Sequence, residues 1–440
     1  MSPLDLAHAG KAQAPLEAAG RMRVLAAIIV PPHLSVSGGA RAGEQLSAAL
    51  SPHCDVTVAS MMNGTGVEVF ERPGLRRSPV RSALPPLLPW SWLPSRYSTL
   101  FYRSDIPRLI GKGFDVVHLH NPMPALEFER IARACHVRGT PYVISTHGFN
   151  EVANGETIYG FDAARRLLWR QLVVEPVARA VRGAAAIFAL SPADIGILRG
   201  MGFTGEILVV HNGVELPSAP SSDTASPDGA SLDAEVLRKL GIPVARDPHG
   251  IRCMFLANHT PNKGLPDLLS AFGQLNCPFT LMIGGERRDA IDYDRHLKPG
   301  RPDQRIIVTG RLSDAEVAAL FRQSDLFVFP TLADTFPLVV LEAMSHGVPV
   351  LASRVGGIPH QIDESCGMLV PPGQPAALAA AVEGLAAAPE RLRRMGQKAR
   401  ARVAAEFTWA RAAEHAMAGY RHALAQGRGR GGATEIARVE

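Results

Sequence analysis

The chain has 440 residues, of which 46% are hydrophobic and 20% charged, and its formal net charge is +5. This length predicts two or three domains, each large enough to bury a hydrophobic core. The composition excludes a small disulfide scaffold, a fibrous protein and a coiled coil, and the positive charge is too small for a dedicated nucleic-acid-binding protein.

Cysteine usage and hydropathy favour a cytoplasmic protein. The five cysteines are scattered without a Cys-x-x-Cys pair, which indicates reduced thiols rather than disulfides or a zinc site. The sequence contains no run of 18 apolar residues, so no membrane-spanning helix is predicted. The apolar run 24–30 follows Arg21 and Arg23 and ends at Pro31-Pro32. Its short length, with no small-residue cleavage site after it, favours a first β-strand over a signal peptide.

The first half of the chain predicts a parallel α/β domain at 21–216. Residues 1–20 carry weak periodicity and are expected to form a flexible tail. Predicted helices include 39–50 and 126–137, between predicted strands at 24–30, 56–59, 116–120, 142–146, 185–190 and 207–211. Continuous apolar strands separated by helices indicate a parallel sheet that is covered on both faces.

A second α/β domain is predicted at 251–408. Residues 217–231 contain no large apolar residue, and we interpret 217–250 as a linker or hinge. Further strands are predicted at 253–257, 280–283, 306–309, 326–329 and 348–352. The chain thus predicts two Rossmann-like domains facing each other, with ligands bound in the cleft at the carboxyl ends of the strands. The stretch 389–426 is predicted to be helical; its part 409–426 should pack back toward the N-terminal domain, and 427–440 should be disordered.

The stretch 326–352 carries the clearest chemistry. A helix is predicted to begin near Pro337, because proline is favoured in the first helical turn. Free N–H groups at such a helix start can bind a phosphate. Asp334 precedes the helix and Glu342 lies inside it, so both carboxylates could accept hydrogen bonds from sugar or ribose hydroxyls.

These residues resemble the E-x7-E motif of the family 4 glycosyltransferases, which have the GT-B fold. Asp334 and Glu342 are followed by AMSHGVPVLAS and by the turn Gly356-Gly357-Ile358-Pro359. Similar matches run along almost the whole chain: SGG at 37–39, DVVHLH at 115–120, STHG at 145–148, HNGV at 211–214, NKG at 262–264 and IGGE at 283–286.

The resemblance implies a retaining, metal-independent transferase with no cofactor, whose nucleotide-diphosphate sugar is held mainly by the C-terminal half. Lys263 would neutralise the leaving diphosphate, Glu342 would bind the ribose, and Asp334 would bind hydroxyls of the transferred sugar. His147 would lie over that sugar. We therefore predict His147, Lys263 and Asp334 as catalytic residues. The other predicted donor-binding residues are Gly38, Gly39, Asn258, Gly285, Arg311, Thr335, Phe336, Pro337, Leu338 and Val339.

Other motifs support weaker interpretations. His118 and His120 share one face of a strand, but a zinc site would need a third ligand, so core or acceptor-cleft histidines are favoured. The Asp292-x-Asp294 pattern lies in a polar stretch and is interpreted as incidental. Asn258 stands where the family usually has an arginine, which leaves Lys263 as the assigned diphosphate cation unless Arg311, Arg287 or Arg288 compensates.

A basic and aromatic segment predicts contact with an anionic membrane surface. Residues 71–108 contain seven arginines against two acidic residues, interleaved with Trp and Tyr, a mixture that suits an anionic bilayer. The predicted contacts are Arg76, Arg77, Arg81, Trp90, Trp92 and Arg96. A long acceptor-side loop or a surface that binds single-stranded nucleic acid would have a similar composition, although the transferase motifs disfavour nucleic acid.

The predicted function is transfer of a sugar to a hydroxyl acceptor, a saccharide or lipid-linked saccharide, in cell-envelope or exopolysaccharide biosynthesis. The protein would work in the cytoplasm and contact the inner face of the membrane at its periphery. Alternatives on the same fold are a weakly active or inactive homologue that binds a nucleotide sugar or a membrane, and a nucleotide-sugar epimerase.

Overall fold

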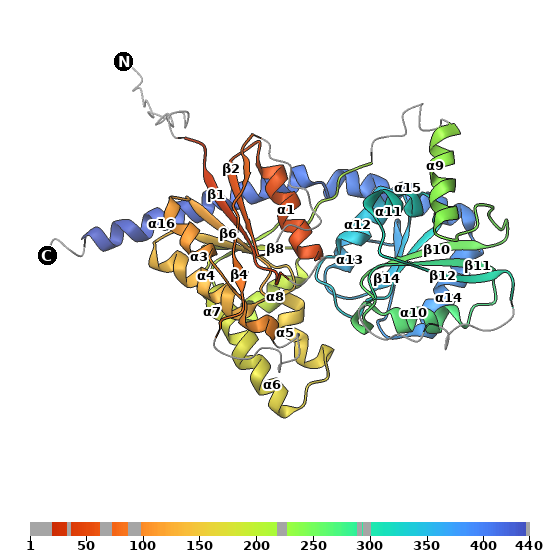
Figure 1. Cartoon of the computed structure of the whole chain (residues 1–440), viewed down its shortest axis with the longest axis horizontal. Coiled ribbons are helices and arrows are strands. Elements are labelled where there is room, and N and C mark those ends of the chain that lie inside the picture. Colours follow the sequence, from red (N-terminus) through yellow and green to blue (C-terminus); the bar gives the residue numbers. More distant parts are fainter. Residues whose placement is uncertain are drawn as a thin grey trace, which may run out of the picture.

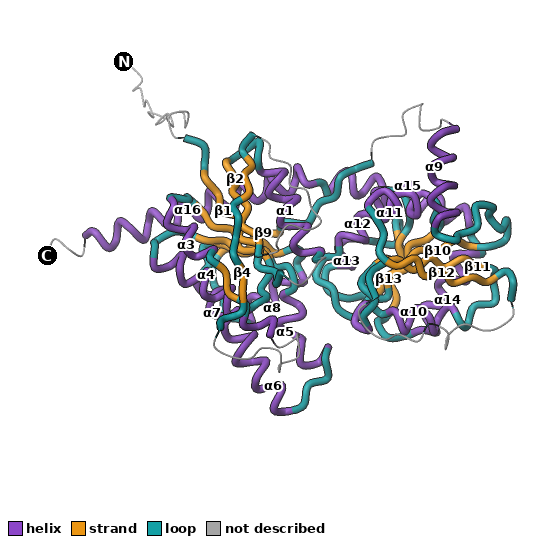
Figure 2. Tube along the Cα trace, viewed as in Figure 1, coloured by secondary structure: helices purple, strands orange, loops and turns teal. Residues whose placement is uncertain are grey.

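Two α/β domains lie side by side (Figure 1), as the sequence predicts. The structure is a computed structural model that describes residues 20–32, 37–61, 73–86, 98–217, 227–287, 293 and 301–436, with side chains outside 227–231 and 427–436. In each domain the strands form a central sheet and the helices lie outside it (Figure 2). The predicted fold class, two facing Rossmann-like domains, is confirmed.

The N-terminal domain contains a seven-stranded sheet, within the described residues, with the order β3-β2-β1-β6-β7-β8-β9. Neighbouring strands are parallel throughout. The strands are β1 (Arg23–Ile28), β2 (Asp55–Ser60), β3 (Leu75–Arg77), β6 (Val116–His120), β7 (Tyr142–Ser145), β8 (Ala186–Ala189) and β9 (Glu206–Val209), with a separate antiparallel pair of β4 (Ser82–Ala83) and β5 (Arg103–Ser104). The helices are α1 (Gly38–Leu50), α3 (Ile106–Leu109), α4 (Ala125–Val137), α5 (Phe149–Ile158), α6 (Ala163–Trp169), α7 (Glu175–Gly183) and α8 (Ala193–Gly200).

The C-terminal domain contains a six-stranded parallel sheet, within the described residues, with the order β12-β11-β10-β13-β14-β15. Its strands are β10 (Ile251–Leu256), β11 (Phe279–Gly284), β12 (Gln304–Gly310), β13 (Leu326–Phe329), β14 (Val350–Ser353) and β15 (Gly367–Val370). Its helices are α9 (Pro227–Lys239), α10 (Leu265–Phe272), α11 (Asp314–Arg322), α12 (Leu338–Ser345), α13 (Ile358–Gln361), α14 (Pro375–Ala386) and α15 (Pro389–Glu406), with a short 3₁₀ turn at Pro261–Lys263.

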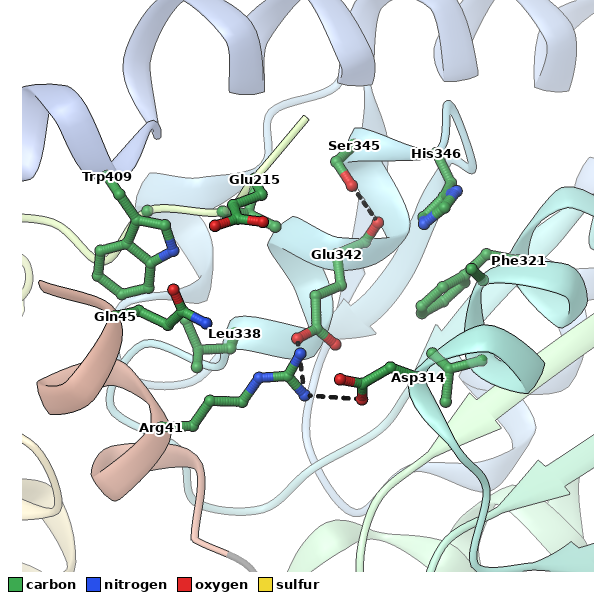
Figure 3. Close-up of a pocket in the computed structure, with 14 residues that line it drawn as sticks. Arg41, Gln45, Glu215, Asp314, Phe321, Leu338, Glu342, Ser345, His346 and Trp409 are labelled. Atoms are coloured by element: carbon green, nitrogen blue, oxygen red, sulfur yellow. Dashed lines mark hydrogen bonds and ion pairs between the residues drawn. The ribbon is translucent and has the colours of Figure 1, made fainter. Parts of the chain in front are cut away.

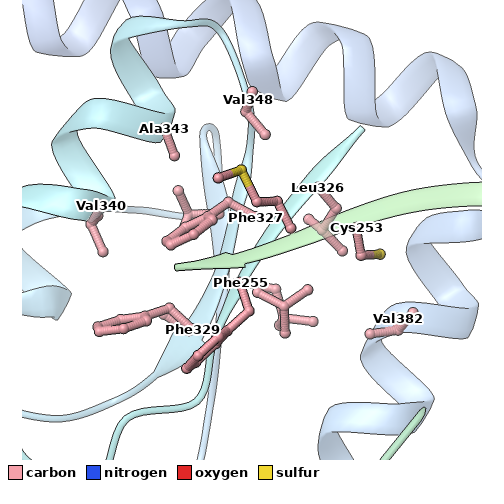
Figure 4. Packing of buried hydrophobic residues seen from close by; sticks show 14 of the residues in the cluster. Cys253, Phe255, Leu326, Phe327, Phe329, Val340, Ala343, Val348 and Val382 are labelled. Atoms are coloured by element: carbon pink, nitrogen blue, oxygen red, sulfur yellow. The ribbon is translucent and has the colours of Figure 1, made fainter. Parts of the chain in front are cut away.

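The core of this domain explains why its strands could be predicted. Phe255 of β10 and Phe327 and Phe329 of β13 are fully buried and pack with side chains from α12 (Figure 4). Strands covered on both faces need apolar residues at every position, so they read as continuous apolar runs.

The last helix completes the N-terminal domain. Helix α15 ends beside Phe407, and α16 (Trp409–Ile436) then crosses to the other domain and packs on α1 and β8 (Figure 1). Ala413, Ala416 and Tyr420 of α16 are buried in the same cluster as Val24 of β1. Small alanine side chains let α16 lie close to the sheet.

The structure differs from the sequence analysis in several segments. Helix α9 lies inside the stretch 217–250, where we expected a linker, and α16 continues to Ile436, where we expected a disordered tail from residue 427. The strand β15 was not predicted. No helix within the described ranges is long and apolar enough to span a bilayer.

Only part of the predicted membrane surface is described. Arg76 and Arg81 are exposed, whereas Arg77 forms an ion pair with Glu44 at 2.9 Å. Trp90, Trp92 and Arg96 lie outside the described residues, as do residues 1–19 and the Asp292 and Asp294 of the D-x-D pattern.

Candidate active site

The loop 330–337, which links β13 to α12, is held between two glycine turns. Gly264 has a φ of +72°, and a Cβ added there would lie 1.8 Å from the Pro330 carbonyl oxygen. Gly356 has a φ of +51°, and its Cβ would lie 1.8 Å from the Asp334 carbonyl oxygen. Only glycine fits these left-handed positions against a passing backbone. The two glycine motifs therefore fix the path of the loop.

Lys263 and Asp334 are in direct contact. The lysine Nζ lies 2.7 Å from Oδ1 and 2.9 Å from Oδ2 of Asp334, and Thr331 donates its hydroxyl to Oδ2 at 2.6 Å. The backbone N–H of Leu332 donates to the Asn262 carbonyl at 2.8 Å, which joins the two loops again. The structure thus brings together the two segments from which the sequence analysis builds the diphosphate pocket.

The start of α12 offers backbone donors beside this pair. Pro337 is the N-cap, so the N–H groups of Leu338 and Val339 open the helix and lack an acceptor within it. Nearby carbonyls are already used: that of Thr335 accepts from Gly357 N at 2.7 Å, and that of Pro337 accepts from Gln361 at 3.0 Å. The segment therefore presents mainly N–H groups to a ligand, as an anion-binding helix start does.

Phe336 contacts the N-terminal domain, and its predicted role in donor binding, through main-chain groups, stays a prediction. Its side chain is 4% exposed and stacks on the ring of His211 with 5.1 Å between centroids, and its carbonyl accepts from Asn212 Nδ2 at 3.1 Å. His211 and Asn212 belong to the HNGV motif of the N-terminal domain. Phe336 therefore joins the two domains through its side chain and its carbonyl.

Arg41 of α1 reaches across to the C-terminal domain (Figure 3). Its Nη1 lies 3.8 Å from Glu342 Oε1 and 3.5 Å from Asp314 Oδ1. Burial raises the pKa of Glu342, whereas the Arg41 charge opposes that rise. The sequence analysis missed Arg41 and Asp314, because only the relative placement of the domains brings them to Glu342.

The cavity around this ion pair is small. It measures ≈150 Å³ and is lined by Arg41, Glu342, Asp314, Leu338 and Trp409, among others. Pockets for drug-sized ligands usually occupy about 300–1,000 Å³. Lys263 and Asp334 do not line this cavity, so it covers only the Glu342 side of the candidate site.

Three histidines form a row in the N-terminal domain. His118 is hydrogen-bonded to Tyr420 and Ser145, each at 2.8 Å, as a core histidine would be. The His120 ring lies 3.9 Å from that of His118 and 5.7 Å from that of His147, and neither of its ring nitrogens has a partner within the described residues.

Burial keeps these rings neutral. It lowers the pKa of His118 to about 3 and that of His147 to about 4, and it lowers the pKa of His120 well below its ordinary value. At neutral pH His147 can thus donate or accept a hydrogen bond but carries no charge. No group of three or more His, Cys, Asp or Glu side chains suited to a metal ion occurs in the described part of the chain.

Gly39 is pressed against Asn121, a residue that the sequence analysis did not single out. A Cβ at Gly39 would lie 2.1 Å from Asn121 Nδ2, whereas one at Gly38 would meet nothing within 4 Å. Asn121 has a φ of +67°, and its buried Oδ1 has no partner among the described residues. A side chain at position 39 would therefore displace Asn121, whereas position 38 has space for one.

The remaining predicted residues follow the carboxyl ends of β10, β11 and β12. Gly285 has a φ of +128° and lies against the Ala257 carbonyl, where a Cβ would approach to 1.7 Å. Asn258 is half-buried and Arg311 is exposed. Arg287 lies over the Tyr293 ring at 4.6 Å, and Arg288 is outside the described residues. The structure gives no contact that assigns either Arg311 or Arg287 to the place of the missing family arginine.

Comparison with known proteins agrees with this architecture. The model described as Glycosyltransferase Family 4 matches residues 36–217, and that described as Glycosyl transferases group 1 matches residues 250–388. The structure of sucrose-phosphate synthase from Thermosynechococcus elongatus is similar with a TM-score of 0.66 and 20% identity, covering 92% of this chain and 100% of that one. The two models together match most of the chain, so the chain belongs to the glycosyltransferases that they describe, and the solved structure has the same GT-B fold, which confirms the resemblance.

Individual relatives are similar over part of the chain or at low identity. The chain is 32% identical over 178 residues to MMP alpha-(1->4)-mannosyltransferase of Mycolicibacterium hassiacum, a match that covers 38% of this chain and 41% of that protein. The first curated relatives are matched over only 25–57% of their lengths. Anabaena HepE, solved in complex with UDP-glucose, is similar with a TM-score of 0.63 and 16% identity, covering 89% of this chain and 97% of that one. At this identity the likeness shows the fold alone.

Proposed function

We propose that this glycosyltransferase moves a sugar, with retention and without a metal, from a nucleotide-diphosphate sugar to a hydroxyl acceptor. The observation that carries the proposal is the Lys263–Asp334 contact beside the start of α12, with Glu342 in the same helix. A cation and free N–H groups suit a diphosphate, and the two carboxylates suit sugar and ribose hydroxyls. The complex of HepE with UDP-glucose supports a nucleotide sugar as the donor.

In the proposed reaction the donor binds side chains that form ion pairs with each other in the structure, so these pairs must break. The diphosphate takes Lys263 from Asp334, and the released carboxylate binds hydroxyls of the transferred sugar. The ribose takes Glu342 from Arg41. In each exchange an ion pair within the protein is replaced by contacts with the donor, which are charged for Lys263 and the diphosphate and are hydrogen bonds from neutral hydroxyls for the two carboxylates.

The transfer itself breaks the bond between the anomeric carbon and the β-phosphate oxygen and forms a bond from that carbon to the acceptor oxygen. The acceptor proton goes to the departing β-phosphate, whose growing negative charge is stabilised by Lys263 and the N–H groups of α12. The neutral His147 donates a hydrogen bond to a sugar hydroxyl. Positioning and charge stabilisation thus supply the catalysis.

We further propose a saccharide or lipid-linked saccharide as acceptor, in cell-envelope or exopolysaccharide assembly, at an anionic membrane surface. The exposed Arg76 and Arg81 support this within the described residues. Flotation with liposomes that contain anionic lipid tests the membrane contact. We expect binding that weakens as salt rises, and absence of such binding would remove this part of the proposal.

A weakly active or inactive nucleotide-sugar-binding homologue is the second candidate, and Asn258 favours it because an amide brings no charge to the diphosphate. A thermal-shift screen with UDP, GDP and ADP sugars identifies the donor, and release of nucleoside diphosphate with and without EDTA measures turnover. We expect EDTA-resistant turnover that Lys263→Ala abolishes in a folded protein, and weaker donor binding in Glu342→Ala. Donor binding without turnover would favour the second candidate.

A further inference from the structure

A second cavity lies in the C-terminal domain, at the opposite end of the sheet from the candidate donor site. It measures ≈550 Å³. Its lining includes Ile251 and Phe279, the first residues of β10 and β11, and Asp325, which precedes β13. The candidate donor residues follow the other ends of the same strands, so the length of a six-residue strand, about 20 Å, separates the two sites.

A buried arginine with an unused donor lines this cavity. Arg252, the second residue of β10, is 4% exposed. Its Nη2 donates to the Pro243 carbonyl at 2.8 Å, but its Nη1 is buried and has no hydrogen-bond partner within the described residues. Arginine is rarely buried without a carboxylate or another acceptor, and an unpaired guanidinium nitrogen is a strong donor for an anion, which reaches the buried Nη1 once the Arg252 side chain turns toward the cavity.

The carboxylates of the lining do not fully balance its arginines. Asp325 accepts from Arg246 Nη1 at 2.6 Å but only from the backbone N–H of Arg252 at 2.8 Å, so this carboxylate binds the guanidinium of Arg246 and not that of Arg252. Arg305 is exposed on the same wall, and the described part of the chain shows no ion pair to it. The charged lining residues are Arg246, Arg252, Arg305, Arg393, Asp247, Asp303 and Asp325.

The rest of the wall is largely apolar, with Ile251, Phe279, Pro349 and Leu392. We propose that this cavity binds a small organic anion, with a phosphate or carboxylate head on Arg252 and Arg305 and a compact apolar or ring-shaped body against Phe279 and Leu392. The cavity volume lies within the usual range for small-molecule sites. This site is independent of the proposed donor site, because it uses neither Lys263 nor the start of α12.

Calorimetric titration of the full chain with phenyl phosphate, benzoate and inorganic phosphate tests the proposal. We expect phenyl phosphate or benzoate to bind, and inorganic phosphate to bind more weakly because it lacks a body for the apolar wall. The stronger of the two ring probes identifies the head group. Binding should persist in Lys263→Met, which removes the cation of the donor site, and it should weaken about tenfold in Arg305→Gln, since a charge-assisted contact is lost.

Two further variants locate the binding. Arg252→Gln should abolish it, and if this buried variant does not fold, the exposed Arg305→Gln decides alone. Arg391→Gln is the matched control, because Arg391 is exposed on α15 but does not line the cavity. The proposal is overturned if no probe binds, if binding is lost in Lys263→Met, or if Arg305→Gln and Arg391→Gln bind equally well.

Discussion

The contact between Lys263 and Asp334 predicts that removing the carboxylate charge strengthens the binding of a nucleoside diphosphate. In the structure Asp334 holds the ammonium with two oxygens at 2.7 and 2.9 Å. A diphosphate must break this contact to reach the lysine, so the ion pair opposes its binding. Asp334→Asn keeps the shape of the side chain and removes the charge.

The partial exposure of the pair sets the size of the effect. The side chains of Lys263 and Asp334 are 24% and 16% exposed, so the pair is neither fully solvated nor fully buried. Exposed pairs contribute about 0.2–1 kcal/mol, and breaking buried pairs costs about 3–5 kcal/mol. An intermediate value of about 1–2 kcal/mol corresponds to roughly 5- to 30-fold tighter binding of the nucleoside diphosphate. In Lys263→Met the loss of a charged donor should weaken binding by roughly 10- to 100-fold.

Isothermal titration with UDP, GDP and ADP measures these affinities. Asp162→Asn is the control, because it removes one negative charge at the exposed N-cap of α6, where asparagine caps as well as aspartate. The reasoning fails if Asp334→Asn binds the nucleotide no more tightly than Asp162→Asn does while Lys263→Met binds it weakly. That result would mean that the aspartate does not compete with the ligand.

Substitutions at three further places test separate features, two of them with a matched control. Gly264→Ala should disrupt nucleotide binding, because its Cβ would meet a backbone oxygen at 1.8 Å. Gly373→Ala is the control: its φ of +67° is similar but its surroundings are open, so it should cost only about 1 kcal/mol of stability and leave binding unchanged. His120→Phe should leave the free energy of unfolding unchanged or raise it at about pH 7.5, because the ring nitrogens of His120 have no partner among the described residues. His118→Phe leaves Tyr420 and Ser145 without their partner, so it should lower the free energy of unfolding by about 2–4 kcal/mol, measured by chemical denaturation. Below about pH 6.5 the histidines of the unfolded chain bind protons, whereas the buried rings, whose pKa values are lowered, do not. The free energy of unfolding of the wild type should therefore fall by about 2 kcal/mol for each buried ring between neutral pH and about pH 5, and that of His120→Phe should fall by about 2 kcal/mol less than that of the wild type. Arg41→Gln should tighten nucleotide binding by up to about fivefold by freeing the carboxylate in α12; weaker binding would mean that this arginine contacts the ligand.

Most strands could be predicted because they are buried on both faces, whereas the edge strands β9 and β12 are only partly buried. β6 and β13 have the predicted bounds, and the other predicted strands differ at their ends by a few residues. Helix α9 was missed because its first residues, Pro227 and Asp228, continue a stretch rich in Pro, Ser and Asp. The extension of α16 past residue 426 was missed because the glycine-rich sequence there has a low helix propensity.

The candidate site could be predicted only where one domain builds it. The turn at Gly264 and the carboxylate at Asp334 follow strands of the same sheet, and parallel strands bring their carboxyl ends to one edge. The contact of Arg41 with Glu342 depends on how the two domains meet, which no local pattern encodes. The neutrality of His147 depends on burial by distant segments, and the roles of these residues in binding and catalysis stay predictions.

The crossing of α16 has a consequence for synthesis on the ribosome. The N-terminal sheet ends with Val209, but the helix that covers one of its faces begins at Trp409. At about 5–20 residues per second, the roughly 200 intervening residues take about 10–40 s to translate. For that interval the part of this face around Phe188, which packs against Tyr420, stays uncovered and available to chaperones, although α1 already covers the part at β1 and β2. The first domain to be made is therefore the last to be finished.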